Sequence, residues 1–387
     1  MLKIGQQEID ALTEVIHSGK MFRYDPEGVC GRFEQRYADF LGIRYVTLCT
    51  SGTAALTAAL AGLEIGPGDE VIVPAHTYMA TALAVLAVGA IPIIVDIDES
   101  ITLNPKAFRE AIGPRTKAVI PVHMWGALCD MEKILQIANE RGLLLVEDAC
   151  QCVGGFYKGQ AAGTMGQAGG FSFNYYKNIS AGEGGCVVTN DDRVYRRASC
   201  MIDPCSFYWE GRDDAIRPFA ASGSRASEFQ GAILNVQLDR LPGLLDTLRQ
   251  NKAWLLEASA ETGLKPTPRH SPEGECATSL MYLLPSAKAA EIFAEAVDGT
   301  ILLNTGRHTY TEWDPILDRQ GSHHPALNPF DLPQNALCRK DYSRDMCPTS
   351  LDVLGRTVSI GLNPDQTQQD LENLAAKIKA AASALVQ

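Results

Sequence analysis

Residues 50–56 of this chain, TSGTAAL, place three small hydroxyl side chains and a glycine where a strand pattern changes to a helix pattern. A helix that begins in this way leaves backbone N–H groups without intrahelical partners, and its positive dipole end favours an anion such as a phosphate. An ordinary N-cap formed by Ser51 or Thr53 explains the same residues. The motif alone therefore leaves both interpretations open, and the cap is the simpler one.

Lys177 lies in residues 171–185, FSFNYYKNISAGEGG, between an apolar aromatic run and a glycine-rich turn. Lysine side chains usually keep their charged end in water, so a surface lysine is the common explanation. A lysine held in apolar surroundings is instead a candidate nucleophile that can bond covalently to an aldehyde, because desolvation favours the neutral amine.

Asp148 ends the apolar run LLLVED, and Gln151 follows it closely. A half-buried carboxylate needs a cationic or N–H partner because an unpaired buried charge is costly. A protonated heterocyclic nitrogen would serve, and an N-cap is the alternative. In PAHTYMATA, either His76 or Tyr78 could stack on a planar ligand, although aromatic core packing is the more common explanation.

The combination is more specific than any of its parts. A phosphate cup, a carboxylate, an aromatic ring and a lysine, each following a strand, match what pyridoxal 5'-phosphate requires of a protein. The phosphate anchors the cofactor, the lysine joins its aldehyde, and the carboxylate keeps the pyridine nitrogen protonated.

The elements that must position these residues alternate between short apolar runs and amphipathic segments. Such alternation predicts βαβ units and a largely parallel sheet in an α/β fold, with ligands at the carboxyl ends of the strands. The expected strands are 45–51, 70–75, 91–98, 117–123 and 143–149, and the expected helices are 52–63, 77–89 and 130–142.

Beyond about residue 235 the alternation fades. A helical pattern over residues 227–259, interrupted by Pro242, reads as a connector. We therefore expect a large cofactor-binding domain with an N-terminal helix at residues 1–240 and a smaller α+β domain at 241–387.

Composition narrows the class of protein further. A formal net charge of −12 argues against nucleic acid as a partner, because phosphate backbones need a basic surface. The start of the chain lacks the apolar core of a signal peptide, and the longest apolar stretch, 79–95, contains Gly89 and Pro92, which argues against a membrane span. Eleven cysteines without a CxxC pair indicate reduced thiols in the cytoplasm, and the neighbouring His323 and His324 lack the spacing of a metal site.

Six segments, in order along nearly the whole chain, resemble the DegT/DnrJ/EryC1/StrS sugar aminotransferase family, which has the aspartate aminotransferase fold (fold type I of the pyridoxal phosphate enzymes). They are SGK…FEQRYADFLG, SGTAAL, GPGDEVIVPAHTYMATA, VEDACQ, FSFNYYKNISAGEGG and SEFQGAILNVQL. The resemblance implies a three-layer αβα large domain, a smaller C-terminal domain, and a homodimer with its active sites at the interface.

The resemblance also implies roles around the cofactor for eight residues. Gly52, Thr53, Ala54 and Ser172 would bind the phosphate, Tyr78 would stack on the ring, Asp148 would pair with the pyridine nitrogen, Gln151 would reach the ring hydroxyl, and Lys177 would bond covalently to the cofactor. One departure from the family pattern occurs in AASGSRASEF, where Gly223 or a neighbour replaces an asparagine that contacts the other subunit's phosphate in many relatives.

The implied activity is amino transfer from glutamate to a sugar carbonyl, with Lys177 as covalent tether and as general acid and base. Glutamine as the donor and the role of Glu183 stay open. Related sugar 3-dehydratases carry histidine in place of the lysine, so Lys177 argues against that branch. A decarboxylase or acyltransferase of the same fold, or a non-catalytic scaffold, are further alternatives.

Five segments, including CSFYWEGR and RHTYTEWDPIL, resemble a branch of the family that acts in lipopolysaccharide synthesis. This likeness predicts the C8 aldehyde of 8-oxo-3-deoxy-manno-octulosonate as the acceptor, with a nucleotide-linked 3- or 4-keto sugar or a keto-cyclitol as the alternative. The acceptor's carboxylate would be met by an arginine and its hydroxyls by other side chains. The candidates are Arg23, Arg225, Arg307, His308 and Tyr310, and a structural ion pair is the alternative for each arginine.

Overall fold

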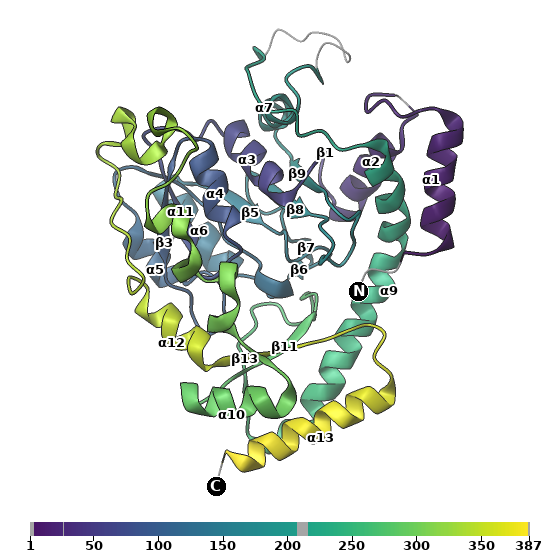
Figure 1. Ribbon diagram of the computed structural model, residues 1–387, viewed down its shortest axis with the longest axis vertical. Helices are drawn as coiled ribbons and strands as arrows, with labels where there is room; N and C mark the ends of the chain where they lie inside the picture. The colour runs from purple at the N-terminus through teal and green to yellow at the C-terminus, as the bar shows by residue number, and fades with distance from the viewer. Residues whose placement is uncertain (1–3, 26, 207–215, 386–387) are drawn as a thin grey trace.

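A computed structural model describes residues 4–25, 27–206 and 216–385 (Figure 1). In this part of the chain, seven strands form a sheet in the order β1-β9-β8-β5-β4-β2-β3. The strands are β1 (Tyr45–Cys49), β2 (Glu70–Pro74), β3 (Ile91–Val95), β4 (Thr116–Val119), β5 (Leu144–Asp148), β8 (Ala168–Ser172) and β9 (Gly185–Thr189). Only β9 runs antiparallel to its neighbours, so the sheet is mainly parallel, as the alternating sequence pattern predicted.

Helices cover the sheet because its strands bury both faces. Every residue of β2, β3, β8 and β9 is buried, which agrees with their lack of polar alternation. The helices of this part are α2 (Val29–Leu41), α3 (Gly52–Gly62), α4 (Ala80–Ala87), α5 (Pro105–Ala111), α6 (Met131–Arg141) and α7 (Asp192–Ile202), while α1 (Gln6–Ser18) packs on α9 (Glu228–Ala258) (Figure 1). A short hairpin, β6 (Phe156–Tyr157) and β7 (Gln160–Ala161), follows β5.

A second sheet has the order β10-β11-β13-β12 and is antiparallel throughout. Its strands are β10 (Lys265–Pro266), β11 (Ser279–Leu283), β12 (Thr300–Ile301) and β13 (Thr357–Gly361), accompanied by α10 (Ala287–Val297), α12 (Pro348–Arg356) and α13 (Gln368–Ala384). The segment between β12 and α12 contains short 3-10 turns and α11 (Asp314–Leu317), and its buried Tyr310, Trp313 and Phe330 belong to the core of the large sheet.

The helix α9 links the two cores. Its Leu234, Leu238 and Leu241 pack in the core of the large sheet, whereas Leu248 and Leu255 pack in that of the small one. The helix continues through Pro242, where the sequence pattern indicated an interruption. The division of the chain at residue 240 stays a prediction. In the described residues no helix is both long enough and apolar enough to cross a lipid bilayer.

Candidate active site

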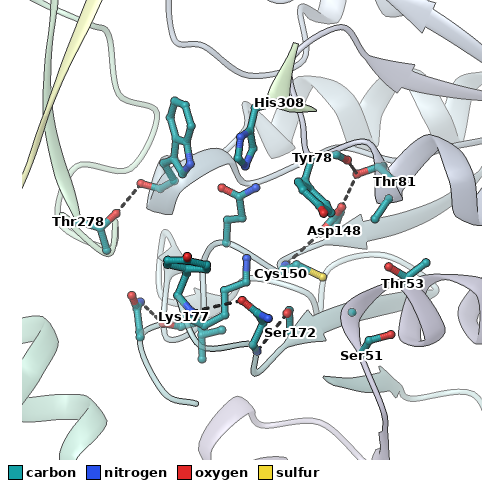
Figure 2. Close-up of a pocket in the computed structure, with 18 of the residues that line it drawn as sticks. Ser51, Thr53, Tyr78, Thr81, Asp148, Cys150, Ser172, Lys177, Thr278 and His308 are labelled. Atoms are coloured by element: carbon teal, nitrogen blue, oxygen red, sulfur yellow. Dashed lines mark hydrogen bonds between the residues drawn. The ribbon is translucent and has the colours of Figure 1, made fainter. Parts of the chain in front are cut away.

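A cavity of about 790 Å³ opens where β1, β5 and β8 end and β9 begins (Figure 2). The far side of the cavity comes from residues 307–308 and from the small sheet, through Ser279, Ser359 and Gly361. The cavity is lined by nine of the cofactor and substrate candidates from the sequence: Gly52, Thr53, Tyr78, Asp148, Gln151, Ser172, Lys177, Arg307 and His308. Segments that are far apart in sequence therefore meet at the carboxyl edge of the sheet, as expected for this fold class.

The start of α3 is both an N-cap and a possible anion cup. The Ser51 hydroxyl oxygen accepts a hydrogen bond from the Ala54 N–H at 3.1 Å, so the Ala54 N–H is used within the cap. Gly52 and Thr53 remain at the cavity wall beside Ser172. A Cβ on Gly52 would lie 2.7 Å from the Cys150 sulfur, so only glycine allows the backbone to approach this closely.

Asp148 is 4% exposed and each of its carboxylate oxygens already accepts one hydrogen bond. The Thr81 hydroxyl donates to Oδ2 at 2.6 Å, and the Cys150 N–H donates to Oδ1 at 3.0 Å (Figure 2). Within the described ranges, no lysine, arginine or histidine forms an ion pair with this carboxylate. A buried carboxylate without a cationic partner suits a protonated ring nitrogen, so the site fits the cofactor that the sequence indicated.

Lys177 is half-buried and lies in the turn after β8, where its N–H donates to the Asn174 carbonyl at 2.9 Å. Figure 2 shows its side chain at the same cavity as Asp148 and Tyr78. Among the residues that the structure describes, no acidic side chain forms an ion pair with it. The amine is therefore available to a ligand in the cavity.

Aromatic and imidazole rings form one wall of the cavity. Tyr78 and His308 have ring centroids 5.4 Å apart, and the Arg307 guanidinium lies 5.6 Å from the Tyr78 centroid. Burial lowers the pKa of His308, and the positive charges of Lys177 and Arg307 lower it further, so its imidazole is neutral at neutral pH.

His76 lies behind this wall rather than in the cavity. It is fully buried and packs edge-on against Trp125, with ring centroids 5.1 Å apart. Burial lowers the pKa of His76 to about 3, and its Nδ1 donates to the Ile101 carbonyl at 3.2 Å. Of the two rings that the sequence left as candidates for stacking, only Tyr78 lines the cavity.

Three of the proposed substrate residues lie outside the cavity. Arg23 forms an ion pair with Glu34, and Arg225 lies 3.2 Å from Asp203, beside a separate pocket of about 50 Å³. Tyr310 is fully buried; its hydroxyl donates to the Arg344 carbonyl at 2.7 Å and accepts from the Cys347 N–H at 3.2 Å. In this chain each of the three has a structural partner in place of a position at the cavity.

Sequence reasoning missed several residues that shape the cavity. Thr81 stands in the PAHTYMATA motif, three residues after Tyr78, and helical spacing from the tyrosine would have placed it on the same side. Trp125 adopts a positive φ of 47° and lines the cavity, which no local pattern indicated. Thr278 and Ser279 reach the cavity only through packing of the small sheet.

A mainly parallel α/β fold with an anion cup, a buried carboxylate, an aromatic ring and a free lysine at one sheet edge defines a pyridoxal-phosphate-dependent enzyme. The comparisons with known proteins specify the class further. The chain belongs to the DegT/DnrJ/EryC1/StrS aminotransferase family, whose model matches residues 2–301. It is therefore a transaminase, and its cofactor is pyridoxal 5'-phosphate.

Two curated relatives illustrate the range of the family. The L-glutamine:2-deoxy-scyllo-inosose aminotransferase of Streptomyces fradiae is 32% identical over 90% of this chain and 86% of its own length. The GDP-perosamine synthase of Caulobacter vibrioides is 38% identical, and the match covers 62% of this chain and 64% of the synthase.

Solved structures agree with this fold. S. venezuelae DesV is 27% identical to this chain. The match covers 97% of this chain and 94% of the DesV chain, with a TM-score of 0.76. An aminotransferase from Psychrobacter cryohalolentis is 24% identical and covers 100% of this chain and 98% of its own, with a TM-score of 0.81, which supports the fold alone.

Proposed function

We propose that this protein transfers an amino group from glutamate to the carbonyl of a sugar, with Lys177 as the catalytic residue. The observation that carries the proposal is the Lys177 amine, which has no acidic partner among the described residues and shares the cavity with the buried Asp148. When bound, pyridoxal phosphate supplies an aldehyde that amines can join and a ring that withdraws electrons. Lys177 anchors the cofactor covalently and then holds and moves the proton of the reaction.

The other cavity residues bind and orient the cofactor in this proposal. Gly52 and Thr53, at the start of α3, and Ser172, at the end of β8, receive the phosphate, while the Ala54 N–H is already donated to Ser51. Tyr78 stacks on the ring, Asp148 pairs with its nitrogen, and Gln151 reaches its hydroxyl group. Together they hold the ring in one orientation relative to the amine.

For the acceptor we propose the C8 aldehyde of 8-oxo-3-deoxy-manno-octulosonate, an acidic sugar that is made for lipopolysaccharide. We propose that the enzyme acts in the cytoplasm. Arg307 supports this choice because it lines the cavity and forms no ion pair with an acidic side chain of the described residues. An arginine in this state suits a carboxylate, which its guanidinium can bind through two N–H groups. The neutral His308 beside it suits a hydroxyl group.

The relatives favour a second candidate. The Caulobacter protein is a GDP-perosamine synthase, and another relative, from Acidithiobacillus ferrooxidans, is a UDP-N-acetyl-3-dehydro-alpha-D-glucosamine 3-aminotransferase, 40% identical over 58% of this chain and 60% of its own length. A nucleotide-linked keto sugar is therefore the alternative acceptor, and a keto-cyclitol is another because of the scyllo-inosose enzyme.

A panel assay tests these assignments. Enzyme supplied with glutamate, and separately with glutamine, is offered the 8-oxo octulosonate, a nucleotide-linked 4-keto sugar and a keto-cyclitol. We expect turnover with glutamate and the octulosonate. Turnover only with a nucleotide-linked sugar would overturn the acceptor and leave the aminotransferase activity intact, whereas no amino transfer to any carbonyl would overturn the function.

Arg307→Gln tests the acceptor by a second route. The substitution should raise KM for the acidic acceptor about tenfold or more, because a hydrogen-bonded charge pair with the carboxylate is lost. Arg319, an exposed arginine that lies 3.9 Å from Asp341, offers the matched control Arg319→Gln. Equal KM values in the two variants would show that Arg307 does not bind the carboxylate.

A further inference from the structure

Two threonines of a single turn form a hydrogen-bonded chain that ends on Asp148. The Thr77 and Thr81 hydroxyl oxygens are 2.7 Å apart. Thr81 Oγ1 lies 2.6 Å from Asp148 Oδ2 (Figure 2). Thr77, Thr81 and Asp148 are 0%, 1% and 4% exposed, so water does not replace any of these contacts.

The direction in which each hydroxyl donates its hydrogen follows from the carboxylate at the end of the series. An ionised carboxylate only accepts hydrogen bonds, and a threonine hydroxyl carries a single hydrogen. The Tyr78 carbonyl is a second acceptor, 3.2 Å from the Thr81 hydroxyl and 3.4 Å from the Thr77 hydroxyl. The contacts to Asp148 and between the two hydroxyls are shorter, so we assign the Thr81 hydrogen to Asp148 and the Thr77 hydrogen to the Thr81 oxygen. Hydrogen bonds in such a series polarise and strengthen one another.

The turn that carries the threonines is itself held by residues 307–308, which lie on the same wall of the cavity as Tyr78. The Thr77 N–H donates to the His308 carbonyl at 3.0 Å, and the Met79 N–H donates to the Arg307 carbonyl at 3.0 Å. Thr81 lies in the first turn of α4, while Asp148 ends β5. The two hydrogen bonds therefore connect the start of α4, which residues 307–308 hold in place, to the end of β5, which carries the Asp148 carboxylate.

We propose that Thr77 and Thr81 are positioning residues that orient the Asp148 carboxylate toward the pyridine nitrogen of the cofactor. With the Cys150 N–H on Oδ1 and Thr81 on Oδ2, the carboxylate cannot rotate without losing a bond. The inference rests on the pairing of Asp148 with the ring nitrogen under the proposed function.

Binding of pyridoxamine 5'-phosphate to the cofactor-free protein tests the inference, because this form of the cofactor does not bond to Lys177. Thr81→Val keeps the shape of the side chain and removes its donor. We expect it to weaken binding about tenfold or more, because a hydrogen bond to a charged group is lost. Thr81→Ser should bind pyridoxamine 5'-phosphate as tightly as the parent does. Thr77→Val should weaken binding by a smaller factor than Thr81→Val does.

An analogue with a C–H group in place of the pyridine nitrogen separates positioning from general damage. For this 1-deaza analogue, Thr81→Val and the parent should bind equally, which also shows that the variant is folded. Equal loss of both ligands, or no loss of either, would overturn the inference. Asp148→Asn tests the assignment of Asp148 independently of Thr81. This variant should lose affinity for the pyridine form and keep its affinity for the deaza form. If both affinities change equally, the assignment of Asp148 fails.

Discussion

Two residues of the site differ in how the protein surrounds them. Asp148 is almost fully buried and held by two donors, whereas Lys177 is half-buried on a turn whose neighbours Tyr175 and Tyr176 are exposed. A carboxylate that must keep one orientation is best held by rigid surroundings. An amine that must form and release a covalent bond and also transfer a proton needs a side chain that can move. This contrast is consistent with the roles proposed for the two side chains.

Lys177→Ala should abolish turnover, by about a thousandfold or more, because the covalent anchor and the proton-transfer group are both lost. The cofactor should still bind through its phosphate and ring contacts. Turnover with glutamate and the cofactor content of the purified protein measure the two effects. Lys158→Ala, which removes an exposed lysine paired with Glu132, is the control, and amino transfer by Lys177→Ala near the control's rate would contradict the assignment.

At the scale of elements, glycines allow the strands to reach the anion cup. β9 begins at Gly185, where a Cβ would lie 2.5 Å from the backbone of Ser51 and 2.6 Å from the Phe171 carbonyl oxygen. The end of β8, the start of β9 and the start of α3 are therefore packed backbone against backbone. The cup owes its shape to this close approach.

Gly185→Ala should displace the start of α3 and weaken phosphate binding, and it should destabilise the protein by about 1–3 kcal/mol through overpacking. Gly243→Ala is the control, since its Cβ would have no neighbour within 4 Å in α9. Titration with pyridoxamine 5'-phosphate and thermal unfolding measure both variants. If Gly185→Ala binds as tightly as Gly243→Ala, the close approach is not needed.

The connector α9 carries a buried charge that should make stability depend on pH. Lys252 lies 2.5 Å from Glu275, which also binds Arg269 at 3.0 Å. Burial and the Arg269 charge lower the pKa of Lys252 from 10.5 to about 8, although Glu275 opposes the shift. Between these two values the unfolded chain binds more protons than the folded one, so this lysine makes the free energy of unfolding rise with pH.

Relative to Lys252→Met, the parent should therefore gain up to about 3 kcal/mol between about pH 7 and about pH 10.5. Comparing the two proteins removes the contribution of the cysteines and tyrosines that titrate in the same range. Urea unfolding at both pH values gives the difference. A difference that does not change with pH would show that Lys252 titrates as it does in the unfolded chain.

At the scale of the whole molecule, large apolar side chains are exposed both at the cavity and on the N-terminal segment. Tyr176 lines the cavity and is 79% exposed, and Ile9, Ile16 and Phe22 of the N-terminal segment are each more than half exposed. Ile9 and Ile16 are seven residues apart in α1, so they share one face of the helix. The resemblance to the family implies a homodimer with its active sites at the interface, and we propose that these exposed apolar side chains contribute to that interface.

Sedimentation should give about twice the chain mass of 41.9 kDa. A double variant, Ile9→Lys with Ile16→Lys, should shift the protein toward the monomer, because lysines at a buried interface leave uncompensated charge. Ile292→Lys, at a 41% exposed position on α10, serves as the control. A monomeric parent would contradict the proposal, as would a double variant that dimerises as well as the control.

Much of this protein follows from local sequence. Apolar runs of strand length, the hydroxyl cap of α3 and the position of Lys177 after β8 depend on neighbours within a few residues, so the α/β class and the cofactor were predictable, and the resemblance in motifs identified the family. The expected strand and helix ranges match those of the structure to within a few residues up to α6.

Only the tertiary structure decided which candidates share the cavity. Tyr78 faces it and His76 does not, because the turn between them is bonded to residues 307–308. Arg307 and His308 reach it, while Arg23, Arg225 and Tyr310 contact other parts of the chain. The contacts between residues 77–79 and residues 307–308 join positions more than two hundred apart in the sequence. Their geometry depends on how distant segments pack together, which no local pattern encodes.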